Sequence, residues 1–244
     1  MSRMPTDAEI DEMSEEELEA YLGAGPTQEL DRRTRRDSGE DSAARPAWLR
    51  RSGAERGFGW LLTVCALIGI LACWELITAQ LNLLRNPDAE LVCDVSPLVS
   101  CGDSLNVWQG NLLGVPNSFI GAIAFGALAA IGAVLLSGAR LPRWMWWGLS
   151  AGSLGGIAFV IWFLTVSIVT FGKLCPFCMV IWSVTIPVAA HSWAWTAAGG
   201  HLGLRDNLAL DLLKSRWWVM AAMYLAVILT IIIAFGSQLA RMFG

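Results

Sequence analysis

Long apolar runs separated by short polar segments dominate the chain from residue 57 onward. A helix that crosses a bilayer needs about 20 predominantly apolar residues, and five runs meet this requirement. Their approximate ranges are Gly57–Gln80, Asn117–Ser137, Trp144–Phe171, Pro176–Thr196 and Trp217–Gly236. The pattern therefore predicts an all-α membrane protein with five transmembrane helices.

The first 50 residues have a different character. Residues 23–47 are rich in Gly, Pro, Ser and charge, and such a segment buries too little apolar surface to offset the entropy of ordering. The chain begins without the basic start and apolar run of a signal peptide. Residues 13–22 fit a short acidic helix, which is either a binding element or part of a solvated tail. We expect a largely disordered tail over 1–50 and a membrane domain over 51–244, with an exposed loop over 81–116.

Charge gives the predicted helices an orientation. The chain is 55% hydrophobic and 16% charged, and Lys and Arg in short loops favour the cytoplasmic side. Basic residues gather before the first run and in the two loops that share its side: Arg45, Arg50, Arg51, Arg56, Arg140, Arg143, Arg205, Lys214 and Arg216. The opposite side has only Arg85, Lys173 and Arg241. Tryptophans, which anchor helices at membrane interfaces, gather at the basic ends: Trp48, Trp60, Trp144, Trp146, Trp147, Trp193, Trp195, Trp217 and Trp218.

This distribution predicts a multi-pass protein of the cell (cytoplasmic) membrane. Its N-terminus and tail are expected inside, and its C-terminus outside. Four of the six cysteines then lie on the outer side, the oxidising compartment in which disulfides persist. No basic patch with interleaved aromatics is present, so we expect no nucleic-acid partner.

Two of the outer cysteines form the motif Cys175-Pro176-Phe177-Cys178. Residues three apart on a helix lie on one side of it, within disulfide reach. Proline suits the first helical position, so Cys175 is expected at the N-cap, where the helix terminus stabilises a thiolate. We interpret the motif as a redox pair, with half a zinc site or an inert structural disulfide as alternatives. The chain has no second motif of this kind, and His191 and His201 fall at the inner side, so no metal is expected.

Cys93 and Cys101 lie in the outer loop with seven residues between them. One interpretation is a disulfide that staples the loop. The other is a second redox pair, because thiolate attack on a disulfide moves two electrons between pairs, and the long interval favours a loop that swings between partners. Cys65 and Cys73 lie in the first helix, too far apart for a mutual bond. We interpret them as small packing residues.

A disulfide site inside a membrane needs an electron acceptor. The chain has no Gly-rich phosphate loop after a strand and no His pair spaced for haem, so the expected cofactor is a quinone, menaquinone or ubiquinone. Asn117 either caps the second helix or directs its amide at the quinone. Trp182, one turn deeper than Cys178, either faces the quinone or packs against other helices.

Two further features concern the outer side. Residues 102–116 contain too few apolar residues to cross the membrane, and we expect them to lie on its surface and roof the bundle. Glu75 is the one acid inside a predicted span. It lies close enough to the end of that span to reach the interface, so a functional role is the less favoured interpretation.

Taken together, these residues resemble the vitamin K epoxide reductase family. The matching elements, in order, are Cys93-Asp94-Val95 with Cys101, Asn117-Ser118-Phe119-Ile120-Gly121, and Cys175-Pro176-Phe177-Cys178. The resemblance covers residues 57 to about 196. It implies a four-helix bundle around a quinone, with the fifth helix peripheral.

The resemblance also implies roles for the cysteines. Cys175 and Cys178 would form the active-site pair, with Cys178 nearest the quinone. Cys93 and Cys101 would form a shuttle pair, in which Cys101 exchanges with Cys175 and Cys93 meets the partner.

Two other site residues follow from the same resemblance. Asn117 matches the asparagine that hydrogen-bonds the quinone oxygen in the family, and Trp182 stands where animal members carry tyrosine. Many bacterial members carry a thioredoxin-like domain after the fifth helix, whereas this chain ends at Gly244. We therefore expect a separate extracytoplasmic, thioredoxin-like (DsbA-like) partner, whose oxidation supports protein disulfide formation.

Three alternative functions are a scaffold, a transporter and an oxidase of separate ancestry. A non-enzymatic membrane scaffold would use the cysteines for a structural disulfide or a zinc site. A transporter would show broken helices or charges at mid-membrane, and these runs show neither. A DsbB-like oxidase of separate ancestry would catalyse the same net reaction, but the order of the motifs disfavours it.

Overall fold

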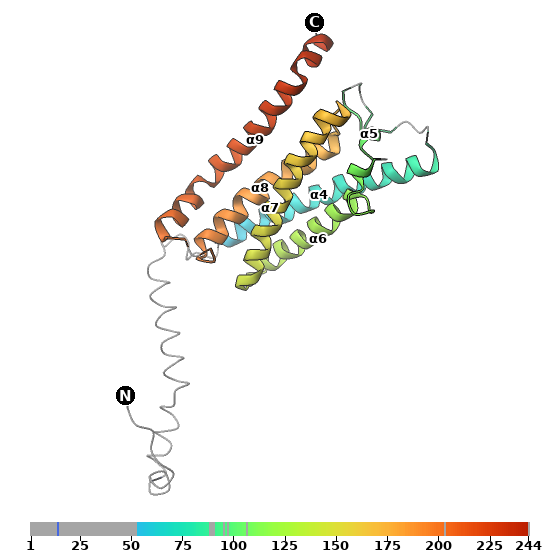
Figure 1. The fold of residues 1–244 in the computed structure, drawn as a ribbon. Helices are drawn as coiled ribbons and strands as arrows, with labels where there is room; N and C mark the ends of the chain where they lie inside the picture. The colour runs from blue at the N-terminus through green and yellow to red at the C-terminus, as the bar shows by residue number, and fades with distance from the viewer. Residues whose placement is uncertain are drawn as a thin grey trace. The chain divides into compact units, whose positions relative to one another are not determined.

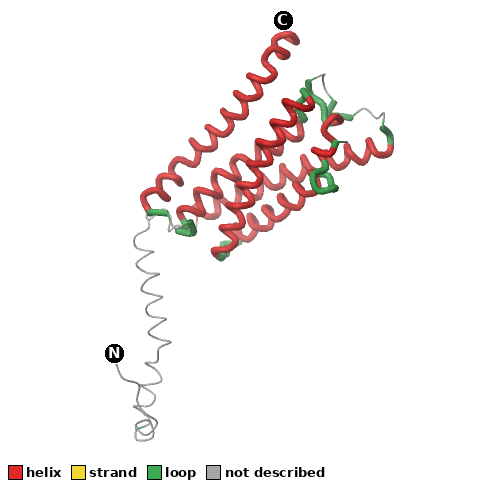
Figure 2. Tube along the Cα trace, viewed as in Figure 1, coloured by secondary structure: helices red, strands yellow, loops and turns green. Residues whose placement is uncertain are grey.

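The computed structural model describes residues 14, 53–87, 91–94, 96, 98–105, 107–202 and 204–243. Apart from Ser14, the predicted tail over 1–50 lies outside the described residues. Residues 55–244 form one compact unit, whose helices are shown in Figures 1 and 2.

The described part of the chain is helical, with no strand in it. Its long helices are α4 (Gly53–Arg85), α6 (Asn117–Leu136), α7 (Arg143–Val166), α8 (Pro176–Ala198) and α9 (Asp206–Phe243). Three short elements accompany them: α5 (Gly102–Leu105), the 3-10 turn η1 (Trp108–Gly110) and the π-helical turn η2 (Ser167–Phe171). The five long helices are long and apolar enough to cross a membrane. This confirms the prediction of an all-α membrane protein with five transmembrane helices.

Two helices extend beyond their predicted spans. α4 continues from Gln80 to Arg85. The loop that follows, which we call the outer loop after its predicted side, therefore begins at Asn86 rather than at 81, and Glu75 lies well before the helix end. α9 begins at Asp206, before the expected start at Trp217. The added residues, 81–85 of α4 and 206–216 of α9, include polar residues and lie outside the apolar runs from which the spans were predicted. A helix needs only internal hydrogen bonds and a compatible backbone, not continuous hydrophobicity.

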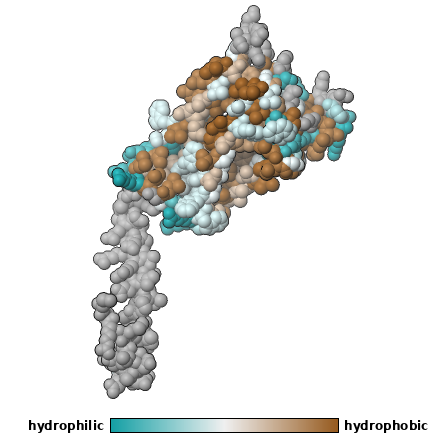
Figure 3. Space-filling view, in the orientation of Figure 1, coloured by the Kyte–Doolittle hydropathy of each residue, from teal (hydrophilic) through white to brown (hydrophobic). Residues whose placement is uncertain are grey.

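The four helices α4, α6, α7 and α8 form the bundle, and α9 packs on α8 at its outside (Figure 1). In the most apolar part of α9 only 6% of the residues are buried, against 67% in α8. The fifth helix is therefore peripheral, as expected. Figure 3 shows hydrophobic side chains over the helical faces and hydrophilic residues toward the ends of the bundle, the distribution required when lipid is the solvent of the faces.

A proline inside α8 creates the attachment point for α9. Pro187 has no backbone N–H, so the carbonyl of Ser183, one turn earlier, loses its helical partner. The hydroxyl of Tyr224 on α9 donates a hydrogen bond to that carbonyl. In an apolar solvent an unpaired carbonyl costs several kcal/mol, so this contact both repairs α8 and positions α9.

Glycines allow α4 and α6 to approach closely. A Cβ atom placed on Gly132 of α6 would lie 2.4 Å from the hydroxyl of Thr63 and 3.1 Å from the carbonyl of Gly59, both on α4. A Cβ on Gly69 would lie 2.6 Å from the ring of Phe125. In lipid no hydrophobic effect drives helices together, and small residues stabilise helix association because they allow close van der Waals packing. Gly126 of α6, in contrast, has open space in front of it.

We predict that Gly132→Val destabilises the protein, whereas Gly126→Val does not. The added methyl groups at Gly132 must displace α4, and overpacking of this kind costs about 1–3 kcal/mol. Thermal unfolding in detergent should show a clearly lower midpoint for Gly132→Val. Because both variants make the same change on the same helix, equal midpoints would contradict the proposed contact.

Candidate functional site

Backbone pairing joins the outer loop to the segment that precedes α8. The N–H of Leu174 donates to the carbonyl of Leu98 at 2.9 Å, and the N–H of Ser100 donates to the carbonyl of Leu174 at 3.1 Å. These bonds form an isolated parallel bridge between Val99 and Leu174. The residue after each paired segment is a cysteine, Cys101 on one side and Cys175 on the other, so the pairing brings the two cysteines together.

The two outer cysteine pairs lie next to each other. Cys93 and Cys101 form a disulfide with their Cα atoms 5.7 Å apart, and Cys175 and Cys178 are free thiols. The Sγ atoms of Cys101 and Cys175 are 3.6 Å apart, a contact from which thiol–disulfide exchange needs only a small approach. The sulfurs of Cys93, Cys101 and Cys175 share one buried apolar cluster. This arrangement allows two electrons to pass between the pairs.

The long interval between Cys93 and Cys101 predicted a loop that swings between partners. In the structure the loop is held by the Leu174 pairing and by the carboxylate of Asp94. The Asp94 Oδ1 accepts hydrogen bonds from the Ser100 hydroxyl at 2.6 Å and from the backbone N–H of Cys101 at 3.0 Å. Exchange between Cys101 and Cys175 therefore requires no large movement, because the contact is already present.

Hydrogen bonds keep Asp94 ionised. The slight burial of this carboxyl would raise its pKa, but hydrogen bonds from the Ser100 hydroxyl and from the backbone of Gly102 and Cys101 outweigh burial and lower it. The charged carboxylate thus fixes the backbone of Cys101 directly beside Cys175.

Cys175 occupies the N-cap of α8, and Pro176 is the first helical residue, as the motif predicted. The backbone N–H of Cys178 donates to the Cys175 Sγ at 3.4 Å. Hydrogen bonding from the Cys178 side chain is the largest cause that lowers the pKa of Cys175, and it outweighs burial. The backbone of Phe177 and the hydroxyl of Ser104 contribute in the same direction. Cys175 therefore has an increased thiolate fraction, the form that attacks disulfides.

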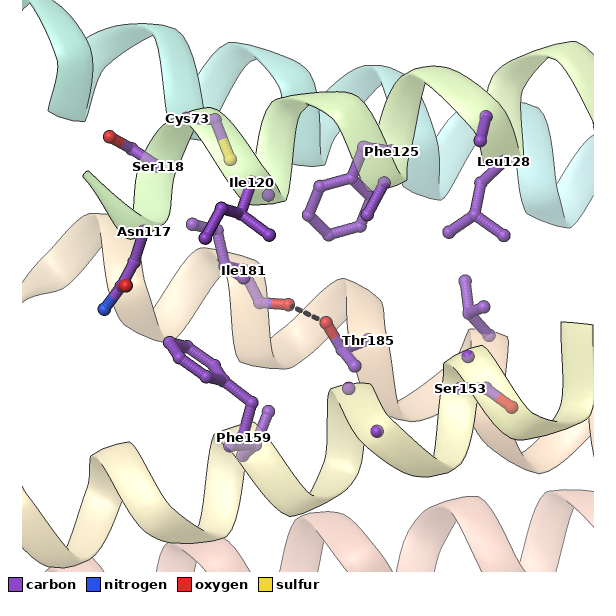
Figure 4. A pocket seen from close by; sticks show the side chains of 18 of the residues that line it. Cys73, Asn117, Ser118, Ile120, Phe125, Leu128, Ser153, Phe159, Ile181 and Thr185 are labelled. Atoms are coloured by element: carbon purple, nitrogen blue, oxygen red, sulfur yellow. Dashed lines mark hydrogen bonds between the residues drawn. The ribbon is translucent and has the colours of Figure 1, made fainter. Parts of the chain in front are cut away.

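A cavity of about 770 Å³ lies between α4, α6, α7 and α8, within the range of about 300–1,000 Å³ of small-molecule sites. Its wall is almost entirely apolar, with Ile120, Phe125 and Phe159 turned into it (Figure 4). Cys178 lines its outer end. The loop residues that line the cavity there, which we call the roof, are Ser104, Leu105, Gly110, Leu112 and Leu113. Described residues of the segment that was expected to roof the bundle therefore line this cavity.

The cavity also contains the other two predicted site residues. Trp182 lines the wall and at the same time packs against Phe163 and Leu164 of α7, so the two interpretations of Trp182 are compatible. Asn117 lines the outer end, but the capping interpretation is wrong, because Pro116 occupies the N-cap and Asn117 the first helical position.

The amide of Asn117 instead bonds the roof. Its Oδ1 accepts from the N–H of Leu112 at 3.2 Å, and its Nδ2 donates to the carbonyl of Gln109 at 2.6 Å. A primary amide has two N–H groups, so one further donor is available at this end of the cavity.

Several residues of the site were not found from the sequence. Gln80 is buried on α4, and its Nε2 donates to the Leu105 carbonyl at 3.2 Å and to the Asn111 Oδ1 at 3.1 Å. Ser104 is buried beside Cys175, with its hydroxyl on the Cys101 carbonyl at 2.8 Å. A sequence signal existed for Gln80, because a polar side chain at the end of an apolar run needs hydrogen-bond partners when it is buried. The sequence contains no comparable signal for Ser104.

The two cysteines of the first helix are both free, as expected. Cys73 is fully buried and lines the cavity, and its Sγ would lie 2.9 Å from a Cβ on Gly121. Cys73 therefore packs between helices and also forms part of the cavity wall. Its place in the wall could not be predicted from helical spacing alone.

Comparison with known proteins identifies the family. The family model described as the vitamin K epoxide reductase family matches residues 60–193. The chain belongs to the vitamin K epoxide reductase family. A search of curated proteins found no match. The matched residues include both outer cysteine pairs, Asn117 and Trp182, and they end before α9 begins at Asp206.

Membership of the vitamin K epoxide reductase family makes this protein a membrane oxidoreductase that works with cysteines, and it associates the protein with quinone use. The five helices agree with a multi-pass membrane protein. In this structure the family's cysteine elements meet at one end of the bundle, where the roof separates the outer disulfide from the apolar cavity.

We predict that Asp94→Asn loosens the loop around Cys101. A charge-assisted hydrogen bond is stronger than a neutral one by about 1 kcal/mol, so hydrogen exchange of the amides of Cys101 and Gly102 should become about five-fold faster. Asp211→Asn, at an exposed position on α9, is the matched control.

The wild-type protein should show the same loosening in acid. The folded-state pKa of Asp94 is lowered. The Asp94 carboxylate therefore stabilises the loop fully above the ordinary pKa of 3.8. That contribution is lost as the pH falls through the lower, folded-state pKa. Unchanged protection in Asp94→Asn at neutral pH would show that the carboxylate does not hold the loop.

Proposed function

We propose that this protein oxidises an extracytoplasmic, thioredoxin-like dithiol and passes its two electrons to a membrane quinone, and so supports protein disulfide formation. The observation that carries the proposal is the placement of α8. Cys175 contacts the outer disulfide through Cys101, whereas Cys178, one turn further, lines the cavity. A single turn of helix thus connects the disulfide that a donor thiol would reduce with a cavity that would hold a lipid-soluble molecule.

The proposed relay proceeds through two exchanges. A donor dithiol reduces the Cys93–Cys101 disulfide and is itself oxidised to a disulfide. The Cys101 thiolate then attacks the Sγ of Cys175 in an oxidised Cys175–Cys178 pair, the S–S bond of that pair breaks, and Cys178 leaves as a thiolate. Cys93 next attacks Cys101 in the mixed disulfide and restores the Cys93–Cys101 bond. The inner pair is then reduced, which is the combination of states in this structure.

The cavity fits a quinone in shape and chemistry. When bound, a quinone accepts the two electrons and two protons of the reduced pair. The residues around it supply an apolar wall, the Cys178 thiol at the outer end, and the amide of Asn117 beside it. Asn117 would donate a hydrogen bond to a quinone oxygen, and Trp182 would form part of the wall that holds the quinone.

The length of the cavity supports a quinone with an apolar tail. The cavity continues along α7 as far as Trp144 and Met145 at the opposite end of that helix. Gly148, Gly152 and Gly155 line this part, and a Cβ on any of them would meet nothing within 4 Å. These glycines are therefore not required by helix contacts, and their missing side chains leave space in this part of the cavity, where an isoprenoid chain would lie.

The orientation completes the proposal. Arg56, Arg140, Arg143, Arg205 and Lys214 lie at the end of the bundle opposite the cysteine pairs. Positive residues favour the cytoplasmic side, so the pairs and the C-terminus face outward, where a thioredoxin-like partner and its substrates are oxidised. The partner's thiol would meet Cys93, because Cys101 is already in contact with Cys175.

The main alternative is a scaffold whose cysteines bind zinc or staple a loop. Zinc needs three or four protein ligands, and within the described residues no three His, Cys, Asp or Glu side chains form such a group. A purely structural disulfide would not require a second, free cysteine pair in contact with it. Metal analysis of the purified protein separates the two functions.

We predict that Cys178→Ser abolishes quinone reduction by the purified protein with a reduced dithiol donor. Loss of the thiol that faces the cavity should lower the rate by about three orders of magnitude or more, as followed by quinone absorbance. Cys65→Ser, which changes a free cysteine outside the cavity, is the control. Retained activity in Cys178→Ser would refute the assignment of this residue.

We further predict that Asn117→Ala slows quinone reduction about ten-fold or more, the effect of losing one buried hydrogen bond to the reacting oxygen. Asn111→Ala also loosens the roof, since Asn111 bonds Leu105, Val107 and Gln80, but its amide does not line the cavity. A larger loss in Asn117→Ala, with outer exchange intact, supports a contact with the quinone. Equal losses would reduce the role of Asn117 to holding the roof.

A further inference from the structure

A second, smaller cavity lies beside the outer disulfide. Its volume is about 110 Å³, and its wall is formed by Glu75, Thr78, Ala79 and Asn82 of α4, by Leu91, Val92 and Cys93 of the loop, and by Phe177. We call it the donor crevice. It is far smaller than the quinone-sized cavity, but it is comparable in size to a small thiol-bearing side chain.

The outer disulfide needs such an opening. Cys93 is only 3% exposed and Cys101 is fully buried, so neither sulfur is accessible on an open surface. The Sγ of Cys101 is in contact with Cys175, and that side is closed to an incoming donor. The donor crevice is lined by Cys93 itself. Beside it Val92 is 98% exposed, an apolar side chain available for contact with a protein donor.

One charged group lines the donor crevice. Glu75 is exposed on α4 and is the only acidic or basic residue in the described wall of the crevice. The ionised carboxylate of Asp94 directly follows Cys93 in the chain. A carboxylate in the same crevice wall as Cys93 makes the approach of an additional negative charge unfavourable.

We propose that the donor crevice is the entry by which a reducing thiol reaches Cys93, and that Glu75 selects there against anionic thiols. The proposal deepens the proposed function and rests on it, because it names the entry of the electron donor. A neutral or positively charged donor segment is favoured, and an anionic thiol such as glutathione is disfavoured. From the sequence a functional role for Glu75 was the less favoured interpretation, because the place of Glu75 in the crevice depends on the fold of the loop.

The chemical step is an ordinary exchange. A donor thiolate attacks the Sγ of Cys93, a donor–Cys93 disulfide forms, and the Cys93–Cys101 bond breaks with Cys101 leaving as a thiolate. The second thiol of the donor then attacks its own first sulfur, releases Cys93, and completes a donor disulfide. The donor is oxidised by two electrons, the outer pair is reduced, and the two protons of the donor thiols are returned to the pair or to water.

The test uses the full chain with Cys175→Ser and Cys178→Ser, so that the outer disulfide is the remaining exchange site and no quinone takes part. Its reduction is followed by thiol alkylation with three reagents of similar size: cysteamine, 2-mercaptoethanol and 2-mercaptoethanesulfonate. Rates are compared per thiolate. These reagents share a two-carbon thiol and differ only in whether the far end is positive, neutral or negative.

We predict that Glu75→Gln accelerates reduction by 2-mercaptoethanesulfonate about two- to three-fold relative to 2-mercaptoethanol, and about six- to ten-fold relative to cysteamine, at low salt. Removing one unit charge at about 6–8 Å in a largely aqueous site favours the anionic reagent and disfavours the cationic reagent by similar factors. The difference should disappear at about 1 M salt, where the screening length is about 3 Å. Asp211→Asn is the control for an acid elsewhere. The same change for all three reagents, or no change, would refute selection by charge.

The entry itself is tested by closing it. Asn82→Trp places a large ring at the exposed edge of the crevice and should slow all three reagents about ten-fold or more, whereas Leu81→Trp, on the adjacent exposed face of α4, should not. Equal rates in the two variants would refute the crevice as the entry. If no thiol reduces the outer disulfide in any variant, the proposed relay itself fails, so the two failures are distinguishable.

Discussion

The site depends on one short piece of backbone pairing, in which Leu174 bonds both Leu98 and Ser100. Cys101 and Cys175 are far apart in the chain, and each directly follows a paired segment. Two hydrogen bonds therefore determine whether their sulfurs meet, and the sulfurs lie 3.6 Å apart. The pairing occurs outside the transmembrane spans, where the chain is free to leave helical geometry, and it places the cysteines at the boundary where α8 enters the apolar region.

Polar side chains concentrate at this boundary, and apolar side chains make up most of the cavity wall. On the outer side Asp94, Gln80, Asn111 and Asn117 use their side chains to hold loop backbone that has no helical partner. Below the roof the cavity wall is almost entirely apolar. An unpaired polar group is costly in such surroundings, so the roof amides both satisfy the loop and leave the cavity suitable for a lipid-soluble molecule.

The transmembrane helices and the N-cap position of Cys175 could be predicted from the sequence for identifiable physical reasons. Apolar runs of spanning length can only be helices in lipid, and Pro176 determined the N-cap of α8 at Cys175. The ends of α4 and α9 were less predictable, because a helix continues into water without an apolar signal. The roles of Ser104, Gln80 and Glu75 depend on how the loop folds back over α4, and no local pattern encodes a contact between residues so far apart in the chain.

The position of the two free thiols on α8 bears on why the protein contains two pairs rather than one. Cys178 lines the cavity, whereas Cys175 lies in the apolar cluster with the outer disulfide. A protein thiol that approaches the cysteine end of the bundle cannot reach Cys178 without displacing the roof, and a molecule in the cavity meets Cys178 rather than Cys93. In the proposed relay the outer pair therefore reacts with protein dithiols, and the inner pair reacts with a molecule in the apolar cavity. Combining the two tasks in a single pair would require the same sulfur to be open to a protein and closed to water.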